Sequence, residues 1–182
     1  MITGGPATGK TAIVDKLKVL GYSCYEEVIR KLTAEAQASG DIVEQHSNPI
    51  ALVTDALEFN NKLIDLRLDD YKNANEPLNF YDRGMPDVLA YMDYFNQEIP
   101  FQFKEVCKNH HYDKIFILPP WEKIFGTDSE RFENFEQAKD IYKSLKKTYE
   151  SFGYQCIEVP KASIEKRTRF ILSSIDASCN NQ

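Results

Sequence analysis

The N-terminal segment constrains the chain most, because it contains a motif that binds phosphate. Residues 4–11 read Gly4-Gly5-Pro6-Ala7-Thr8-Gly9-Lys10-Thr11, which fits the pattern G-x-x-x-x-G-K-[ST]. A glycine-rich turn lets successive backbone N–H groups point at an anion, and the helix that follows adds the positive end of its dipole. We expect Lys10 to contact the β- and γ-phosphates of ATP and the Thr11 hydroxyl to bind Mg²⁺. The segment therefore predicts a nucleotide-binding loop.

Composition limits the class of protein and its partners. The chain has 182 residues, 42% of them hydrophobic and 27% charged, which is typical of one globular domain spanning residues 1–182. Its net charge of −6 argues against nucleic acids and anionic membranes as partners. No apolar run approaches the ~20 residues of a membrane span. The cysteines are scattered without a C-x-x-C pair, so we expect free thiols in a reducing, cytoplasmic environment.

Strand and helix patterns alternate along the chain, which predicts a parallel sheet with helices on both faces. Strands are expected at 1–3, 22–26, 78–81, 115–118 and 156–159. Helices are expected at 10–20, 27–39, 50–71, 86–95, 101–109, 134–152 and 163–175, with a loop at 41–49 and a polar, frayed tail from 176. Only three residues remain for the first strand, so this strand is unusually short or the native start lies upstream of Met1.

Asp82 directly follows the predicted strand at 78–81. In open α/β sheets, ligands collect at the carboxyl ends of the strands, where the phosphate-binding loop also lies. The Asp82 carboxylate can face Mg²⁺, directly or through water, or act as a base for an acceptor hydroxyl. The alternative is a turn aspartate that caps the helix beginning near Pro86.

Two arginines are candidates for stabilising a transferring phosphoryl group, which requires planar, bidentate donors. Arg83 directly follows Asp82, and Arg131 lies in the charged, aromatic stretch after the strand at 115–118. Either residue can instead be a solvated surface cation. Arg67, on the long helix at 50–71, is expected to be a surface charge.

Glu27 and Arg30 lie three residues apart in the first turn of the helix predicted after the second strand. Residues at this spacing share one helix face, so both can project toward the edge of the sheet. They are candidates for binding the hydroxyls or an anionic group of a phosphate acceptor. A helix-capping carboxylate in an ordinary ion pair explains the pattern equally well.

Several segments together resemble one known family. They are Ile2 to Thr11, the Glu27-x-x-Arg30 pair, Phe80-Tyr81-Asp82-Arg83-Gly84-x-Pro86-Asp87 and Leu118-Pro119-Pro120-Trp121-Glu122. The family comprises bacterial phosphate-loop ATPase domains that are loosely filed under the AAA name. It is similar to nicotinamide riboside kinase and the deoxynucleoside kinases.

The resemblance covers nearly the whole chain and implies a three-layer P-loop NTPase fold. It implies a five-stranded parallel sheet in the order 2-3-1-4-5 and a small lid at about 119–134, with Asp128-Ser129-Glu130-Arg131 matching the lid motif. The short first strand departs from the family pattern.

These features predict a Mg²⁺·ATP-dependent phosphotransferase, that is, a kinase acting on a small, nucleoside-like acceptor. Lys10, Asp82, Arg83 and Arg131 would carry out the transfer, with Thr11 and Asp82 at the Mg²⁺ ion. Two alternatives stay open: a nucleoside-triphosphate hydrolase whose acceptor is water, and a non-catalytic ATP sensor.

Overall fold

The computed structural model describes residues 1–26, 28, 56–125 and 134–179. Several sequence predictions lie outside these residues: nearly all of the helix at 27–39, the loop at 41–49, the start of the helix at 50–71, and the lid residues 126–133. Glu27, Arg30 and Arg131 are therefore not described.

In the part of the chain that the structure describes, five short strands form two parallel sheets. The strands are β1 (Ile2–Gly4), β2 (Ser23–Tyr25), β3 (Asn79–Tyr81), β4 (Ile115–Leu118) and β5 (Cys156–Glu158). In the described residues, β1, β4 and β5 form one sheet in the order β1-β4-β5, and β2 pairs with β3 in the other. An isolated parallel bridge between Ile2 and Asp82 joins the two sheets. Its backbone contact is the bond from Arg83 N–H to Ile2 O, at 2.9 Å.

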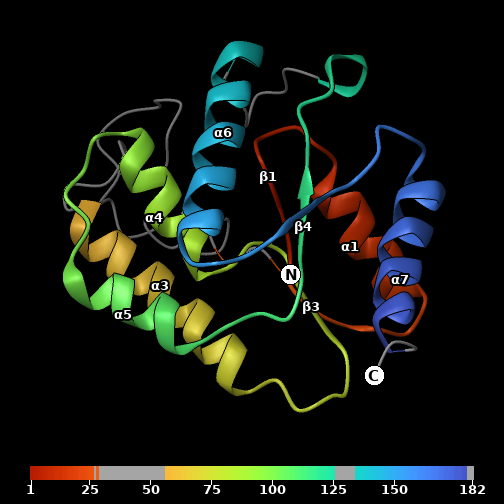
Figure 1. The fold of residues 1–182 in the computed structure, drawn as a ribbon, viewed down its shortest axis with the longest axis horizontal. Helices are drawn as coiled ribbons and strands as arrows, with labels where there is room; N and C mark the ends of the chain where they lie inside the picture. The colour runs from red at the N-terminus through yellow and green to blue at the C-terminus, as the bar shows by residue number, and fades with distance from the viewer. Residues whose placement is uncertain (27, 29–55, 126–133, 180–182) are drawn as a thin grey trace, which may run out of the picture.

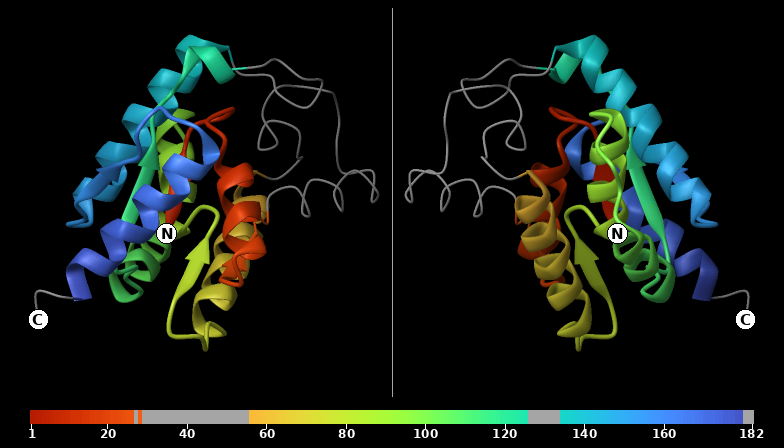
Figure 2. Two further views of the ribbon diagram at one scale, coloured as in Figure 1. Left: turned by 90° about the vertical axis from the view of Figure 1, so that its right-hand side faces the viewer. Right: turned by 90° about the vertical axis from the view of Figure 1, so that its left-hand side faces the viewer.

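Helices flank the strands on both sides (Figure 1). They are α1 (Lys10–Val19), α3 (Ala56–Lys72), α4 (Met85–Tyr94), α5 (Phe101–Asn109), α6 (Phe135–Ser151) and α7 (Ile164–Cys179), with a 3₁₀ turn η2 (Glu122–Ile124). Helices α1 and α7 pack together on one side, and α4 packs against α3, α5 and α6 on the other. The left view of Figure 2 shows the molecule from the side of α1 and α7.

Helix α7 is longer than its sequence pattern predicted. The predicted end at Ile175 is wrong, because the helix continues to Cys179. Residues 164–179 contain neither glycine nor proline, so nothing in the sequence stops the helix at Ile175. The frayed tail predicted from Asp176 is helical up to Cys179.

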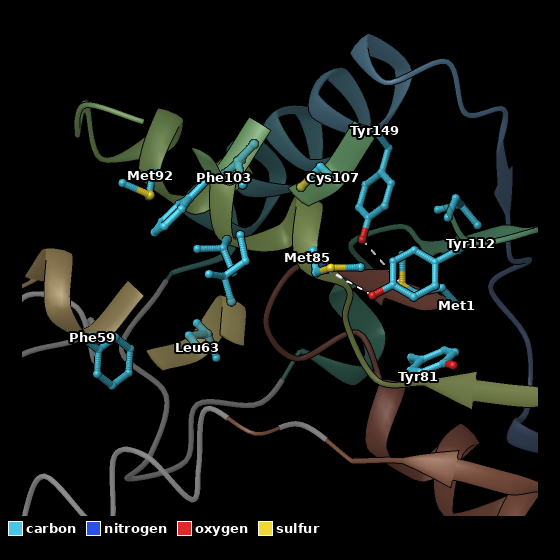
Figure 3. Close-up of a cluster of buried hydrophobic side chains, with 14 residues drawn as sticks. Met1, Phe59, Leu63, Tyr81, Met85, Met92, Phe103, Cys107, Tyr112 and Tyr149 are labelled. Atoms are coloured by element: carbon cyan, nitrogen blue, oxygen red, sulfur yellow. Dashed lines mark hydrogen bonds between the residues drawn. The ribbon is translucent and has the colours of Figure 1, made fainter. Parts of the chain in front are cut away.

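The core lies in two layers, one on each side of the strands, because successive side chains of a strand point to opposite sides. On the α1 and α7 side, Phe116 and Leu118 of β4 pack with Ile13, Leu17 and Ile171. On the opposite side, Ile115 packs in a cluster with residues from α3, α4, α5 and α6, where Tyr112 and Tyr149 point toward Met1 and Met85 (Figure 3). Successive residues of a strand face opposite sides of a sheet, so four consecutive apolar residues fill both layers. Among the described residues, no helix is long and apolar enough to cross a membrane.

Candidate nucleotide-binding and catalytic site

The loop between β1 and α1 has the backbone geometry of a phosphate-binding turn at Gly4 and Gly9. Gly4 has φ +154° and lies so close to β4 that an added Cβ would be 2.7 Å from Leu118 O. Gly9 is the N-cap of α1 in the left-handed region, with φ 83°. A side chain at either position would strain or displace the loop. Ala7 also has a positive φ, 55°, a rare conformation for a non-glycine residue that is typical of functional turns.

Lys10, in the first turn of α1, folds back over the loop. Its side chain is buried, and Nζ donates to Gly4 O at 3.0 Å and Gly5 O at 2.9 Å. The ammonium group therefore lies at the concave face of the turn, where it can exchange carbonyl partners for phosphate oxygens. Thr11, the next residue, is exposed, which leaves it accessible to a metal–nucleotide complex.

Asp82 lies at the carboxyl edge of the strands beside the loop. It is 5% exposed, pairs with Ile2 through the bridge between the sheets, and donates its backbone N–H to Tyr25 O at 2.8 Å. Ile2 is two residues before Gly4, so this pairing holds Asp82 next to the start of the phosphate-binding loop. Asp82 is far in sequence from both Ile2 and Tyr25. Backbone pairing with β1 and β2 nevertheless brings it to the carboxyl edge where the loop lies.

Arg83 also reaches the loop, in a conformation that the sequence pattern did not indicate. Its backbone has φ 70°, and its side chain is 9% exposed. Nη1 donates to Gly4 O at 3.3 Å and lies 3.4 Å from Asp87 Oδ1, with the guanidinium 5.2 Å from the centre of the Tyr91 ring. The side chain is therefore held by α4 and points at the phosphate-binding loop.

Asp87 is a buried polar hub that was not among the predicted site residues. Its carboxylate, 1% exposed, accepts hydrogen bonds from the Thr3 hydroxyl at 2.6 Å, Gly84 N–H at 2.9 Å and the Tyr149 hydroxyl. Burial raises the pKa of Tyr149 well above its ordinary value, and the neighbouring Asp87 charge adds to the effect, so Tyr149 remains a donor. Gly84 is the N-cap of α4, and its backbone N–H bonds to the Asp87 side chain at the third helical position, so the acidic residue in the first turn of the predicted helix was the available sequence signal.

The prediction that Arg67 is a surface charge is wrong. Arg67 is 5% exposed, and its Nη1 donates to Gly84 O at 2.8 Å. It follows Leu63 and Ile64 of the buried face of α3 by four and three residues, so helical periodicity places it on the packed side. Arg67 lies at a small crevice beside Asp82. The lining residues are Tyr25, Glu26, Arg67, Asp70, Tyr81, Asp82, Arg83 and Tyr112.

A second arginine that the sequence reasoning passed over lies against the loop from α7. Arg167 is 6% exposed, and its Nη1 donates to Thr8 O at 2.8 Å. Its guanidinium lies 5.9 Å from the centre of the Trp121 ring. Nothing in the local sequence of α7 distinguishes Arg167 from a solvated helix residue.

A wider groove of about 710 Å³ lies between the segment after β4 and helix α6. Its lining residues are Pro119, Pro120, Trp121, Glu122, Lys123, Phe135, Lys139, Tyr142, Lys143 and Lys161. Two of its lysines are already paired on α6, Lys139 with Glu136 and Lys143 with Asp140. The groove therefore has less free positive charge than its lysine content suggests.

The described geometry thus brings the loop, Asp82 and Arg83 together at one edge. Comparison with protein families gives a match over residues 1–167 to a family described as AAA domain. The chain belongs to this AAA domain family. None of the curated proteins compared with the sequence matches it significantly.

Solved structures with a similar fold include deoxyadenosine kinase, NadR and thymidylate kinase. Deoxyadenosine kinase from M. mycoides, with products dCMP and dCDP bound, is 13% identical with a TM-score of 0.62, covering 97% of this chain and all of that one (100%). NadR in complex with NR has a TM-score of 0.68 at 15% identity, covering 96% of this chain and 49% of NadR.

Thymidylate kinase from Candida albicans has a TM-score of 0.64 at 14% identity, covering 100% of this chain and 92% of that one. At these identities the similarity establishes the fold, which is the P-loop kinase-like α/β fold.

Proposed function

We propose that the chain is a Mg²⁺·ATP-dependent phosphotransferase that acts on a small, nucleoside-like acceptor. The observation that carries the proposal is the junction at Gly4. There, the Gly4 carbonyl accepts hydrogen bonds from both Lys10 and Arg83. Asp82 pairs with Ile2, two residues before Gly4. Two cations and one carboxylate thus converge on the loop, which is what phosphoryl transfer requires. A purely structural turn would not need cations from two separate elements.

Each residue has a role that follows from its chemistry. Lys10 and Arg83 would supply positive charge to the transferring phosphoryl group, where such donors lower the barrier most. The Thr11 hydroxyl and the Asp82 carboxylate are oxygen ligands of the kind that Mg²⁺ prefers. Asp82 directly follows β3, and Thr11 lies in the first turn of α1 after the loop, so the residues present fit the ion. Bound there, Mg²⁺ would neutralise charge on the β- and γ-phosphates.

We propose that the acceptor binds beside Asp82, over a crevice that has no room for a water molecule in this structure. Glu26, at the end of β2, lines it together with Asp82 and Arg83. We propose that Glu27 and Arg30, which follow Glu26 in sequence, bind the acceptor, and that a lid at about 119–134 brings Arg131 to the phosphates. The names of the similar structures support a small acceptor, since they include deoxyadenosine kinase and a complex with NR.

We also propose that the two sheets act as one five-stranded sheet in the order 2-3-1-4-5. The bridge between Ile2 and Asp82 supports this arrangement, because it places β3 beside β1. The same bridge would bring the acceptor crevice to the phosphate-binding loop.

The test is ATP turnover measured with and without a panel of nucleosides and other small metabolites, each with Mg²⁺ and with EDTA. The proposal expects at least one acceptor to accelerate ADP formation and to appear as a phosphorylated product, with no turnover in EDTA. Mg²⁺-dependent ADP formation that no acceptor accelerates would instead identify a hydrolase. ATP binding without any turnover would identify a sensor.

A further inference from the structure

Arg167 is a buried cation for which the described residues provide no anionic partner. Its guanidinium has one hydrogen bond there, to Thr8 O, and its Nε has none. Burial lowers the pKa of its guanidinium below the ordinary value, and no carboxylate among the described residues opposes this shift. An arginine remains charged under these conditions. A buried charge without a counter-ion is costly.

The other two buried arginines of the site differ from Arg167 in this respect. Arg83 lies 3.4 Å from the Asp87 carboxylate. Arg67 lines the crevice that also contains Asp70 and Asp82. Arg167 instead faces backbone carbonyl, glycine and an aromatic ring, which provide no negative charge.

The position of Arg167 identifies which anion could compensate the charge of its guanidinium. An added Cβ on Gly9 would lie 2.9 Å from its Nη2 and 3.1 Å from its Nη1, so the guanidinium packs directly on the backbone of the phosphate-binding loop. Lys10 occupies the Gly4 and Gly5 end of the same loop. The two cations therefore lie at opposite ends of one turn. Helix α7, which carries Arg167, packs against α1 beside the loop (Figure 1).

We propose that Arg167 is a nucleotide-binding residue whose charge is compensated by the phosphates of the nucleotide in the loop. The inference rests on the proposed nucleotide binding and goes beyond it, because it assigns a second loop cation that comes from the C-terminal helix. Phosphate charge at Thr8 and Gly9 removes the cost of the buried guanidinium. The interaction is strong because the guanidinium is shielded from water.

Trp121 provides a fluorescence probe of the surroundings of Arg167. Its ring lies against the Arg167 guanidinium, and it is the only tryptophan in the chain. A change in the electrostatic surroundings of Arg167 therefore reaches the one residue that dominates the fluorescence. Nucleotide binding should change the Trp121 emission, and the change should depend on Arg167.

The experiment compares three variants by calorimetric titration with Mg²⁺ and a non-hydrolysable ATP analogue. Arg167→Met keeps most of the side-chain volume and removes the charge. Arg167→Lys keeps the charge. Arg169→Met is the matched control, since Arg169 is exposed two residues along the same helix.

We expect Arg167→Met to raise the dissociation constant of the ATP analogue roughly 10- to 100-fold, the effect of losing a charge-assisted contact. Arg167→Lys should recover a large part of the affinity, and Arg169→Met should bind like the wild type. The wild-type affinity should fall more steeply with added salt than the affinity of Arg167→Met, because one charge fewer takes part in binding.

Wild-type affinity in Arg167→Met would overturn the inference, and so would equal losses in the Met and Lys variants, which would mean that Arg167 acts through its shape. If Arg167→Met does not fold, the Lys variant decides by its salt dependence and its Trp121 response: wild-type behaviour in both supports the inference, and loss of either contradicts it. If the wild-type protein itself binds no nucleotide, the proposed function fails, which is a separate result.

Discussion

Arg83 Nη1 donates to Gly4 O across 3.3 Å, although the two residues are 79 positions apart in the sequence. This contact connects the Asp82-Arg83-Gly84 turn to the first glycine of the phosphate-binding loop. The same nitrogen lies 3.4 Å from Asp87 Oδ1. The position of a candidate catalytic arginine is therefore determined jointly by β1 and by the first turn of α4.

Lys10→Ala should abolish turnover while leaving the fold intact. Loss of a cation that stabilises transition-state charge lowers kcat by roughly 10²–10³-fold, and ATP should also bind more weakly. The assay is steady-state turnover of the purified variant, with circular dichroism as the check on folding. Lys16→Ala, on the same helix, is the control and should keep wild-type activity. Near-normal turnover in Lys10→Ala would contradict the phosphate-loop mechanism.

Asp82→Asn should lower kcat by at least ~10²-fold, the range for a lost general base. The substitution keeps the shape of the side chain but removes the charge that would hold Mg²⁺ or accept a proton. Nucleotide affinity measured in EDTA should change little, whereas the Mg²⁺ concentration needed for half-maximal turnover should rise if Asp82 binds the ion. The structure makes Gly84, not Asp82, the N-cap of α4, so a variant that is less stable but keeps its activity per folded molecule would show that Asp82 has only a structural role.

Glu27→Gln with Arg30→Ala should impair transfer to the acceptor more than the slow hydrolysis of ATP by water. Acceptor-binding groups orient the attacking hydroxyl, which water does not need. Loss of such contacts, each worth about 1–3 kcal/mol, should lower kcat/KM for the acceptor roughly 10- to 100-fold. KM for ATP should be unchanged. Equal losses in both activities would exclude an acceptor site at these residues.

Tyr149→Phe should destabilise the protein by about 1.5–3 kcal/mol, the usual contribution of a hydrogen bond to a charged group. The substitution removes the hydroxyl that donates to the buried Asp87 carboxylate. Tyr142→Phe is the matched control on the same helix. Its hydroxyl donates to Glu158 at the surface, so we expect a change within about 0.5 kcal/mol. Urea unfolding measures both, and equal effects would contradict the role of Asp87 as a buried hub.

Alkaline pH should destabilise the protein through its buried tyrosines. Burial raises the pKa of Tyr81 from 10.0 to about 12. Above pH 10.0 the unfolded chain loses this proton while the folded chain keeps it, so the free energy of unfolding falls as pH rises. The contribution of Tyr81 is complete below pH 10.0 and is lost as pH rises toward about 12. Urea unfolding across this range should show a shallower decline in Tyr81→Phe, and identical slopes would contradict the assignment.

Local patterns in the sequence were sufficient for the phosphate-binding loop and for the order of the strands and helices that the structure describes. Gly4, Gly9 and Lys10 are close in sequence, and their geometry depends on the backbone of a single turn. Strand β4 was predicted at 115–118 because its apolar run is continuous, and it is observed over the same residues. Such features depend on neighbours within a few positions, so the sequence alone carries them.

Long-range packing decided which charged residues belong to the site. Thr3 and Asp87 are separated by 84 positions, and Thr8 and Arg167 by 159. No local pattern states that α4 and α7 bring Asp87 and Arg167 against the loop. Burial of a charged side chain depends on what packs over it, which only the tertiary structure specifies. The sequence by itself determined the loop with Lys10 and pointed to Asp82 and Arg83, and the folded chain determined that Asp87 and Arg167 also lie beside the loop.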